Sequence, residues 1–98
     1  MNDKFSKEEI RSDVIDIINE SLRIPKDKIN ICSRLFNDLN AESIDLLDIK
    51  YELERKFGIN INDNEIRESL GKELNQKEIY EKLTVESIIT FVNYKLSI

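Results

Sequence analysis

The strongest constraint on the fold is a helical pattern that runs from Ser43 to Phe57. On a helical wheel of about 100° per residue, its apolar residues fall into two groups. One forms a continuous stripe suited to a core and consists of Leu46, Ile49, Leu53 and Phe57. The other lies across the helix and consists of Ile44, Leu47 and Tyr51. Because a small domain needs only one buried face per helix, the second group is expected to be covered by another element or exposed for a partner.

Helical patterns also occur on both sides of this segment. Ser6 and Glu9 have the spacing of a capping box, so a helix is expected from about Lys7. After the central helix, Gly58 is expected to end it, because glycine adopts the left-handed conformation readily. A third helix is expected to carry Ile66, Leu70 and Leu74, and a last one, capped by Thr84, to carry Val85, Ile88, Ile89, Val92 and Leu96.

A loop of unusual length, from Pro25 to Glu42, separates the first two helices. Loops longer than about 12 to 15 residues in compact domains are usually functional or held down by packing. Regularly placed apolar residues are expected to anchor this loop across the bundle: Ile29, Ile31, Leu35, Phe36 and Leu39. We interpret Phe36 as part of the core.

The size and composition favour one helical domain. At 98 residues, the chain is expected to form a single domain over residues 1–98. Only two glycines and one proline occur, which favours helices over a turn-rich β architecture. The net charge of −5 argues against nucleic-acid binding, which normally needs a basic surface, and favours partners with basic patches.

Several classes of site are excluded by the residues that the chain lacks. With no histidine and one cysteine, it contains no Ser-His-Asp triad, Cys-His pair or common zinc site, and we predict neither catalytic nor metal-binding residues. Cys32 is expected to be a small buried residue, and a lone cysteine fits a reducing compartment. No apolar run approaches the roughly 18 residues of a membrane span, so a cytoplasmic location is expected.

Ser43, at the start of the central helix, has two interpretations. Serine is a favoured N-cap residue, and its hydroxyl could simply accept a backbone N–H. A helix N-terminus is also a natural seat for a phosphate group, because its free N–H groups and the helix dipole both favour negative charge.

The residues around this serine favour the second interpretation. The stretch from Leu39 through Glu42-Ser43-Ile44 to Phe57-Gly58-Ile59 resembles the signature of acyl carrier proteins. The resemblance implies an all-α, acyl-carrier-like bundle of four helices, with a long first loop and an extra helical insert before the last helix. It also implies that Ser43 carries covalent 4′-phosphopantetheine from coenzyme A, which holds acyl groups as thioesters for fatty-acid, lipid or secondary-metabolite synthesis.

Three features depart from the family pattern. Glu42 stands where the family nearly always has Asp, and Asn40 stands where it usually has Gly. About a dozen residues are inserted before the last helix, within the stretch from about Glu68 to Lys82, and Asn75 and Glu78 in this stretch form a second cap-like start. This insert resembles an extension in specialised carriers that deliver very long or hydroxylated acyl chains to lipid A.

The resemblance also implies partners and a place for the cargo. The expected partners are a phosphopantetheinyl transferase and acyl-loading and acyl-transfer enzymes with basic patches. They are expected to contact Ile44, Asp45, Leu47, Asp48, Tyr51, Glu52 and Glu54. The acyl cargo is expected between the second and third helices, near Leu46, Ile61 and Ile66. We expect a monomeric carrier and not an enzyme; the alternatives are a peptidyl or aminoacyl carrier, and an unmodified interaction module in which Ser43 only caps its helix.

Overall fold

The computed structural model describes residues 5–62, 64–71 and 74–96. These residues form five α-helices and one short 3-10 helix, and they contain no β-strand. The helices are α1 (Lys7–Leu22), η1 (Lys26–Lys28), α2 (Ser43–Phe57), α3 (Glu65–Leu70), α4 (Gln76–Lys82) and α5 (Val85–Leu96). The all-α prediction is confirmed, and α4 is the extra helix expected within the insert.

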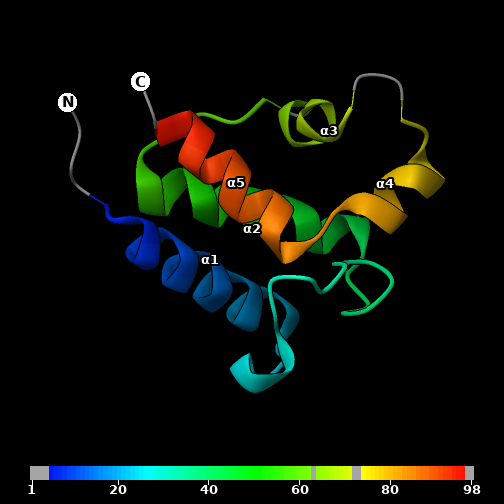
Figure 1. The fold of residues 1–98 in the computed structure, drawn as a ribbon, viewed down its shortest axis with the longest axis horizontal. Coiled ribbons are helices and arrows are strands. Elements are labelled where there is room, and N and C mark those ends of the chain that lie inside the picture. The colour runs from blue at the N-terminus through cyan, green and yellow to red at the C-terminus, as the bar shows by residue number, and fades with distance from the viewer. Residues whose placement is uncertain (1–4, 63, 72–73, 97–98) are drawn as a thin grey trace.

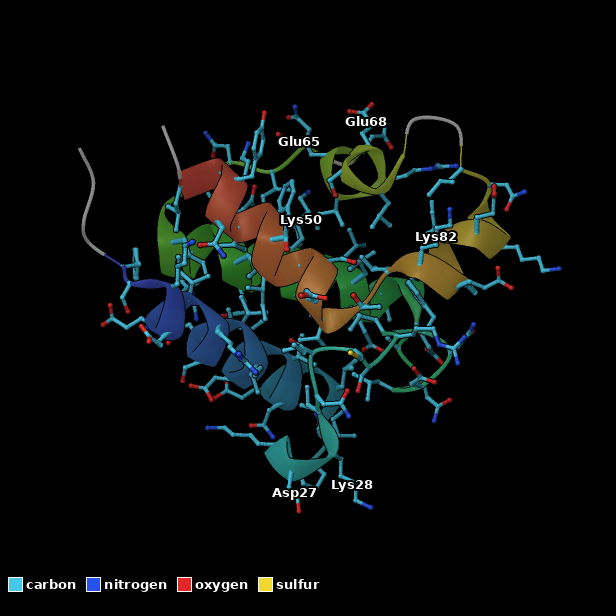
Figure 2. The ribbon with its side chains drawn as sticks, in the orientation of Figure 1. Asp27, Lys28, Lys50, Glu65, Glu68 and Lys82 are labelled. Carbon is cyan, nitrogen blue, oxygen red and sulfur yellow. The ribbon has the colours of Figure 1, made fainter. Side chains whose placement is uncertain are left out.

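Helix α1 packs against both α2 and α5, while α3 packs against α5 and α4 (Figure 1). Their apolar stripes meet in one core, whose largest fully buried side chains are Ile18, Leu35, Ile49, Leu53, Leu83 and Ile88. Figure 2 shows Asp27 and Lys28 of η1 at one edge of the molecule and Glu65 and Glu68 of α3 at the opposite edge. The bundle therefore places α3 and α4 together on one side, away from the turn that follows α1.

Three of the predicted helix caps, at Ser6, Asn75 and Thr84, are confirmed by reciprocal hydrogen bonds. The Ser6 hydroxyl accepts from the Glu9 N–H at 3.1 Å, and the Glu9 carboxylate accepts from the Ser6 N–H at 2.9 Å. Asn75 and Glu78 make the same pair of bonds at the start of α4. Thr84 accepts from the Ser87 N–H at 3.1 Å ahead of α5. These caps satisfy donors that a helix start otherwise leaves without partners, and so fix where each helix begins.

The long loop is held by backbone hydrogen bonds to the junction between α4 and α5. The Leu35 N–H donates to the Leu83 carbonyl, and the Val85 N–H donates to the Ser33 carbonyl, both at 2.9 Å. Arg34 and Thr84 form an isolated antiparallel bridge between these bonds. Ile29, Leu35 and Phe36 are buried as predicted. The loop is therefore fixed in place by the C-terminal part of the chain.

Two predictions about the fold are wrong. The third helix ends at Leu70 and does not reach Leu74, because Gly71 follows with a φ of 153°, outside the helical range. Cys32 is exposed. The turn that begins at Asn30 explains this exposure: Asn30 accepts from the Cys32 N–H through its side chain, and Ser33 is the residue that turns inward.

Candidate functional site

Ser43 is the first residue of α2, and its side chain is exposed. Glu42, not Ser43, occupies the N-cap position, with an extended backbone at φ −113° and ψ 168°. The interpretation of Ser43 as the N-cap is therefore wrong. Within the part of the chain that the structure describes, the Ser43 hydroxyl takes part in no hydrogen bond. The hydroxyl has no structural task there that a modification would disrupt.

The backbone around Ser43 offers donors to an anion. The N–H groups of Asp45 and Leu46 both donate to the Glu42 carbonyl, whereas those of Ser43 and Ile44 donate to no backbone carbonyl of the described residues. Such unpaired N–H groups, together with the helix dipole, favour a negative charge at the helix start. A phosphodiester on Ser43 would lie beside these groups.

Asp45 and Asn40 shape the entry into α2. The Asp45 carboxylate accepts a hydrogen bond from the Glu42 N–H at 2.9 Å, so this predicted partner residue also stabilises the helix start. Asn40 has a φ of 60°, in the left-handed region. This conformation explains why an acyl carrier usually has Gly there, and why Asn, which tolerates it better than most residues, can replace Gly.

A cavity of about 360 Å³ opens beside Ser43. Its lining includes Leu46 of α2 and Ile66 of α3, as predicted for the cargo site, but not Ile61. Ile61 is buried, and its N–H donates to the Glu54 carboxylate at 2.9 Å. The full lining is Phe36, Ser43, Leu46, Leu47, Lys50, Asn62, Asn64, Ile66, Arg67, Leu70, Ile79, Tyr80 and Leu83.

Phe36 and Tyr80 also line this cavity, although no pattern in the sequence places them there. Their rings are stacked, with centroids 4.3 Å apart and an interplanar angle of 12°. Phe36 is buried, as predicted for a core residue, but it also lines the cavity together with Tyr80 of the insert. No spacing rule connects two aromatic residues from segments so far apart in the chain.

The second apolar face of α2 is exposed. Ile44 is 64%, Leu47 is 47% and Tyr51 is 59% exposed. No other described element covers these three side chains, so the structure places them together on the surface beside Ser43. Large apolar side chains gathered on one exposed face are a common feature of interaction sites.

The carboxylates predicted for partner binding differ in their surroundings. Asp48 is exposed and forms no hydrogen bond or ion pair with a described residue. Glu52 pairs with Arg55 at 3.2 Å. Glu54, bonded to the Ile61 N–H, ties the end of α2 to the segment before α3. Among these carboxylates, Asp48 is therefore the one with the fewest hydrogen bonds and ion pairs to described residues, and the most available to a partner.

Comparison with known proteins identifies the family. A family model described as "Phosphopantetheine attachment site" matches residues 12–69, more than half of the chain. The matched region contains the long loop, α2 and nearly all of α3. The chain belongs to the acyl carrier protein family.

Individual acyl carrier proteins agree with this assignment. The acyl carrier protein of Thermotoga maritima is 32% identical over 92 residues, which cover 93% of this chain and 96% of that protein. The acyl carrier protein of Borrelia garinii subsp. bavariensis is 44% identical over 64 residues, covering 65% of this chain and 80% of that protein. The first match spans almost the full length of both proteins.

Membership establishes the general role. The protein carries acyl groups, and its cofactor is covalently attached 4′-phosphopantetheine. Acyl carrier proteins are carriers and not catalysts, and they interact with a phosphopantetheinyl transferase and with acyl-handling enzymes. No helix in the described part of the chain combines the length and apolarity needed to cross a membrane. An exposed serine at a helix start, beside a partly apolar cavity, fits the cofactor in both chemistry and position.

Proposed function

We propose that Ser43 is the residue that carries the 4′-phosphopantetheine arm, and that the protein delivers acyl thioesters for fatty-acid or lipid synthesis. The observation that carries this proposal is the position of Ser43: exposed at the first residue of α2, with an unengaged hydroxyl, and at the edge of a cavity of about 360 Å³. The hydroxyl is accessible to a transferase, and an attached acyl chain would have apolar surface within reach.

The chain supplies a nucleophile and a seat for the product. In the active site of a separate transferase, the Ser43 Oγ would attack the β-phosphate of coenzyme A. The pyrophosphate P–O bond would break, adenosine 3′,5′-bisphosphate would leave, and the hydroxyl proton would pass to a base of the transferase, whose Mg²⁺ would stabilise the developing charge. The N–H groups of Ser43 and Ile44 then favour the anionic phosphodiester. The arm supplies the terminal thiol on which an acyl group is held. Position and recognition come from the protein.

The exposed face of α2 is the proposed docking surface for partner enzymes. It combines the apolar side chains of Ile44, Leu47 and Tyr51 with the carboxylate of Asp48. Apolar contacts supply binding energy, and complementary charge speeds the encounter with a basic patch. Asp45, Glu52 and Glu54 contribute negative charge to the same helix while they hold their internal bonds.

We further propose that residues 1–98 act as one monomeric carrier domain without catalytic activity of its own. One continuous core with residues from α1, α2, α3 and α5 supports the single domain. A cytoplasmic location is also proposed, supported by the lone cysteine, which fits a reducing compartment.

Intact mass spectrometry tests the attachment site. The protein is incubated with coenzyme A, Mg²⁺ and a broad-specificity phosphopantetheinyl transferase, beside Ser43→Ala and Ser6→Ala. We expect the native protein and Ser6→Ala to gain one phosphopantetheine, and Ser43→Ala to gain none. Ser6 is the matched control, because it is also an exposed serine at a helix start but already caps that helix.

No gain in the native protein, with the fold intact by circular dichroism, would contradict modification by this transferase and favour an unmodified interaction module. Glu42→Asp separates these two outcomes, because it restores the residue usual in the family. Modification of Glu42→Asp alone would indicate a dedicated transferase for this carrier.

A further inference from the structure

The insert helix α4 contributes a wall to the cavity beside Ser43. Ile79 and Tyr80 of α4, and Leu83 directly after it, line the same cavity as Ser43. Figure 1 shows α4 beside the end of α2 at which Ser43 lies. Side chains of the insert therefore lie in the space that an acyl chain tethered to Ser43 would enter.

This wall is held rigidly. Tyr80 is half-buried and stacks on the buried ring of Phe36, with 4.3 Å between the ring centroids. Next to the stack, the Leu35 N–H donates to the Leu83 carbonyl at 2.9 Å, which joins the long loop to the end of α4. Because both rings are packed and the backbone beside them is hydrogen-bonded, the pair resists displacement by a ligand.

We propose that Tyr80 limits the length of the acyl chain that the carrier can hold in this cavity. The inference rests on the proposed function, because it requires an acyl group tethered at Ser43. Leu46, Ile66, Leu70 and Ile79 give the cavity an apolar lining that suits a hydrocarbon chain. Each methylene group that enters leaves water and stabilises the folded protein, until the chain meets the Phe36–Tyr80 pair. Carbons beyond that length stay in water and add nothing.

The test compares acyl forms of increasing chain length. The transferase loads the native protein, Tyr80→Ala, Tyr80→Phe and Tyr94→Ala from a series of straight-chain acyl-coenzyme A donors, butyryl to palmitoyl, and Tm is measured for each product. For the native protein, Tm is expected to rise with acyl chain length, by up to about 3 to 6 °C for each methylene that is buried. Beyond the longest chain that the cavity holds, Tm is expected to stay constant. In Tyr80→Ala, the plateau should move to chains about two to four carbons longer, because the lost ring leaves a void.

The two other variants are matched controls. Tyr80→Phe keeps the stacked ring and should keep the native plateau. Tyr94, a tyrosine of α5 that is 72% exposed, does not line this cavity, so Tyr94→Ala should also keep it. If Tyr80→Ala does not fold, Tyr80→Leu replaces it and should shift the plateau in the same direction by a smaller amount.

The outcomes separate this inference from the function on which it rests. If neither the native protein nor Glu42→Asp gains mass, the proposed function is overturned and this inference with it. Loaded and folded proteins with the same plateau in Tyr80→Ala and the native chain overturn the inference alone. An equal shift in Tyr80→Phe also overturns it, because the hydroxyl and not the ring would then set the limit.

Discussion

Lys95 of α5 donates a hydrogen bond to Glu65 of α3, with 2.8 Å between Nζ and Oε2, and so joins two helices from distant parts of the chain. Both side chains are about three-quarters or more buried, with exposed fractions of 20% and 26%. The pair lies where α3 forms one edge of the bundle. The same helix contributes Ile66 to the lining of the cavity. The pair therefore holds one wall of the cavity against α5.

This ion pair predicts a pH-dependent stability. The hydrogen bond from Lys95, and then the Asn62 N–H, lower the pKa of the Glu65 carboxyl. The ionised Glu65 carboxylate stabilises the folded protein fully above the ordinary glutamate pKa of about 4.3. This stabilisation is lost as the pH falls through the lower pKa that Glu65 has in the folded state. We expect Lys95→Met to lower the free energy of unfolding by about 1 kcal/mol at pH 7, and by progressively less below pH about 4.

Denaturation in urea at a series of pH values measures this effect. Lys28→Met is the control, because Lys28 is an exposed lysine of η1 at the opposite edge of the molecule (Figure 2). A cost of Lys95→Met that stays constant from neutral to acid pH would show that packing of the lysine stem, and not its charge, matters.

Ser43→Ala should abolish modification without destabilising the fold. The hydroxyl makes no hydrogen bond with a described residue, and alanine is the best helix former, so the free energy of unfolding should change by less than about 0.5 kcal/mol. Ser6→Ala, by contrast, should cost about 1 kcal/mol, because it removes a true cap. Chemical denaturation of both variants checks this contrast. An equal decrease in the free energy of unfolding for the two variants would indicate that Ser43 also caps its helix.

Tyr51→Ala should weaken partner recognition. Tyr51 is 59% exposed and contributes little to the core, so Tm should be almost unchanged. The kcat/KM of the transferase for this carrier should fall about tenfold, as for the loss of an aromatic anchor worth roughly 1.4 kcal/mol. Tyr94→Ala, which removes an exposed tyrosine from α5, should leave that kcat/KM unchanged. Equal kcat/KM values for Tyr51→Ala and the native protein would exclude this face from transferase docking.

The stability of the protein should depend on how readily the residue at position 40 adopts the left-handed backbone conformation. The φ of 60° at Asn40 is readily adopted by glycine and costs other residues with a Cβ about 1 to 2 kcal/mol. We expect Asn40→Ala to be less stable than the native protein by about 1 kcal/mol, and Asn40→Gly to lie within about 0.5 kcal/mol of it. Thermal denaturation distinguishes the two variants, and equal Tm values for them would mean that the loop relaxes out of the left-handed conformation.

The predictions from sequence were accurate where short-range chemistry decides the structure. The cap at Ser6, the helix stop at Gly58, and the two faces of α2 follow from residues within a few positions of one another. The helical period alone separates Ile44, Leu47 and Tyr51 from the core stripe, whereas only the structure decides that this second face is exposed and not covered. The role of Ser43 stays a prediction, supported by its family and its position.

The features that could not be predicted depend on distant parts of the chain. The hydrogen bond between Leu35 and Leu83, and the stack of Phe36 on Tyr80, join segments that no periodicity relates. Cys32 was placed in the core on its residue type, whereas the turn geometry directs it outward. The acyl cargo was predicted to lie between α2 and α3, but the presence of a cavity there and the contribution of α4 to it depend on how the insert folds back.

The hydrogen bonds between the long loop and the α4–α5 junction also determine when the loop takes its final place during synthesis. The Leu35 N–H donates to the Leu83 carbonyl, and the Val85 N–H donates to the Ser33 carbonyl, so both bonds can form only after the ribosome has added residues as far as Val85. A nascent chain that ends after α2 therefore presents Ser43 next to a loop that these two hydrogen bonds do not yet hold in place. Protection of the Leu35 amide from hydrogen exchange would mark the moment at which the chain becomes a finished carrier.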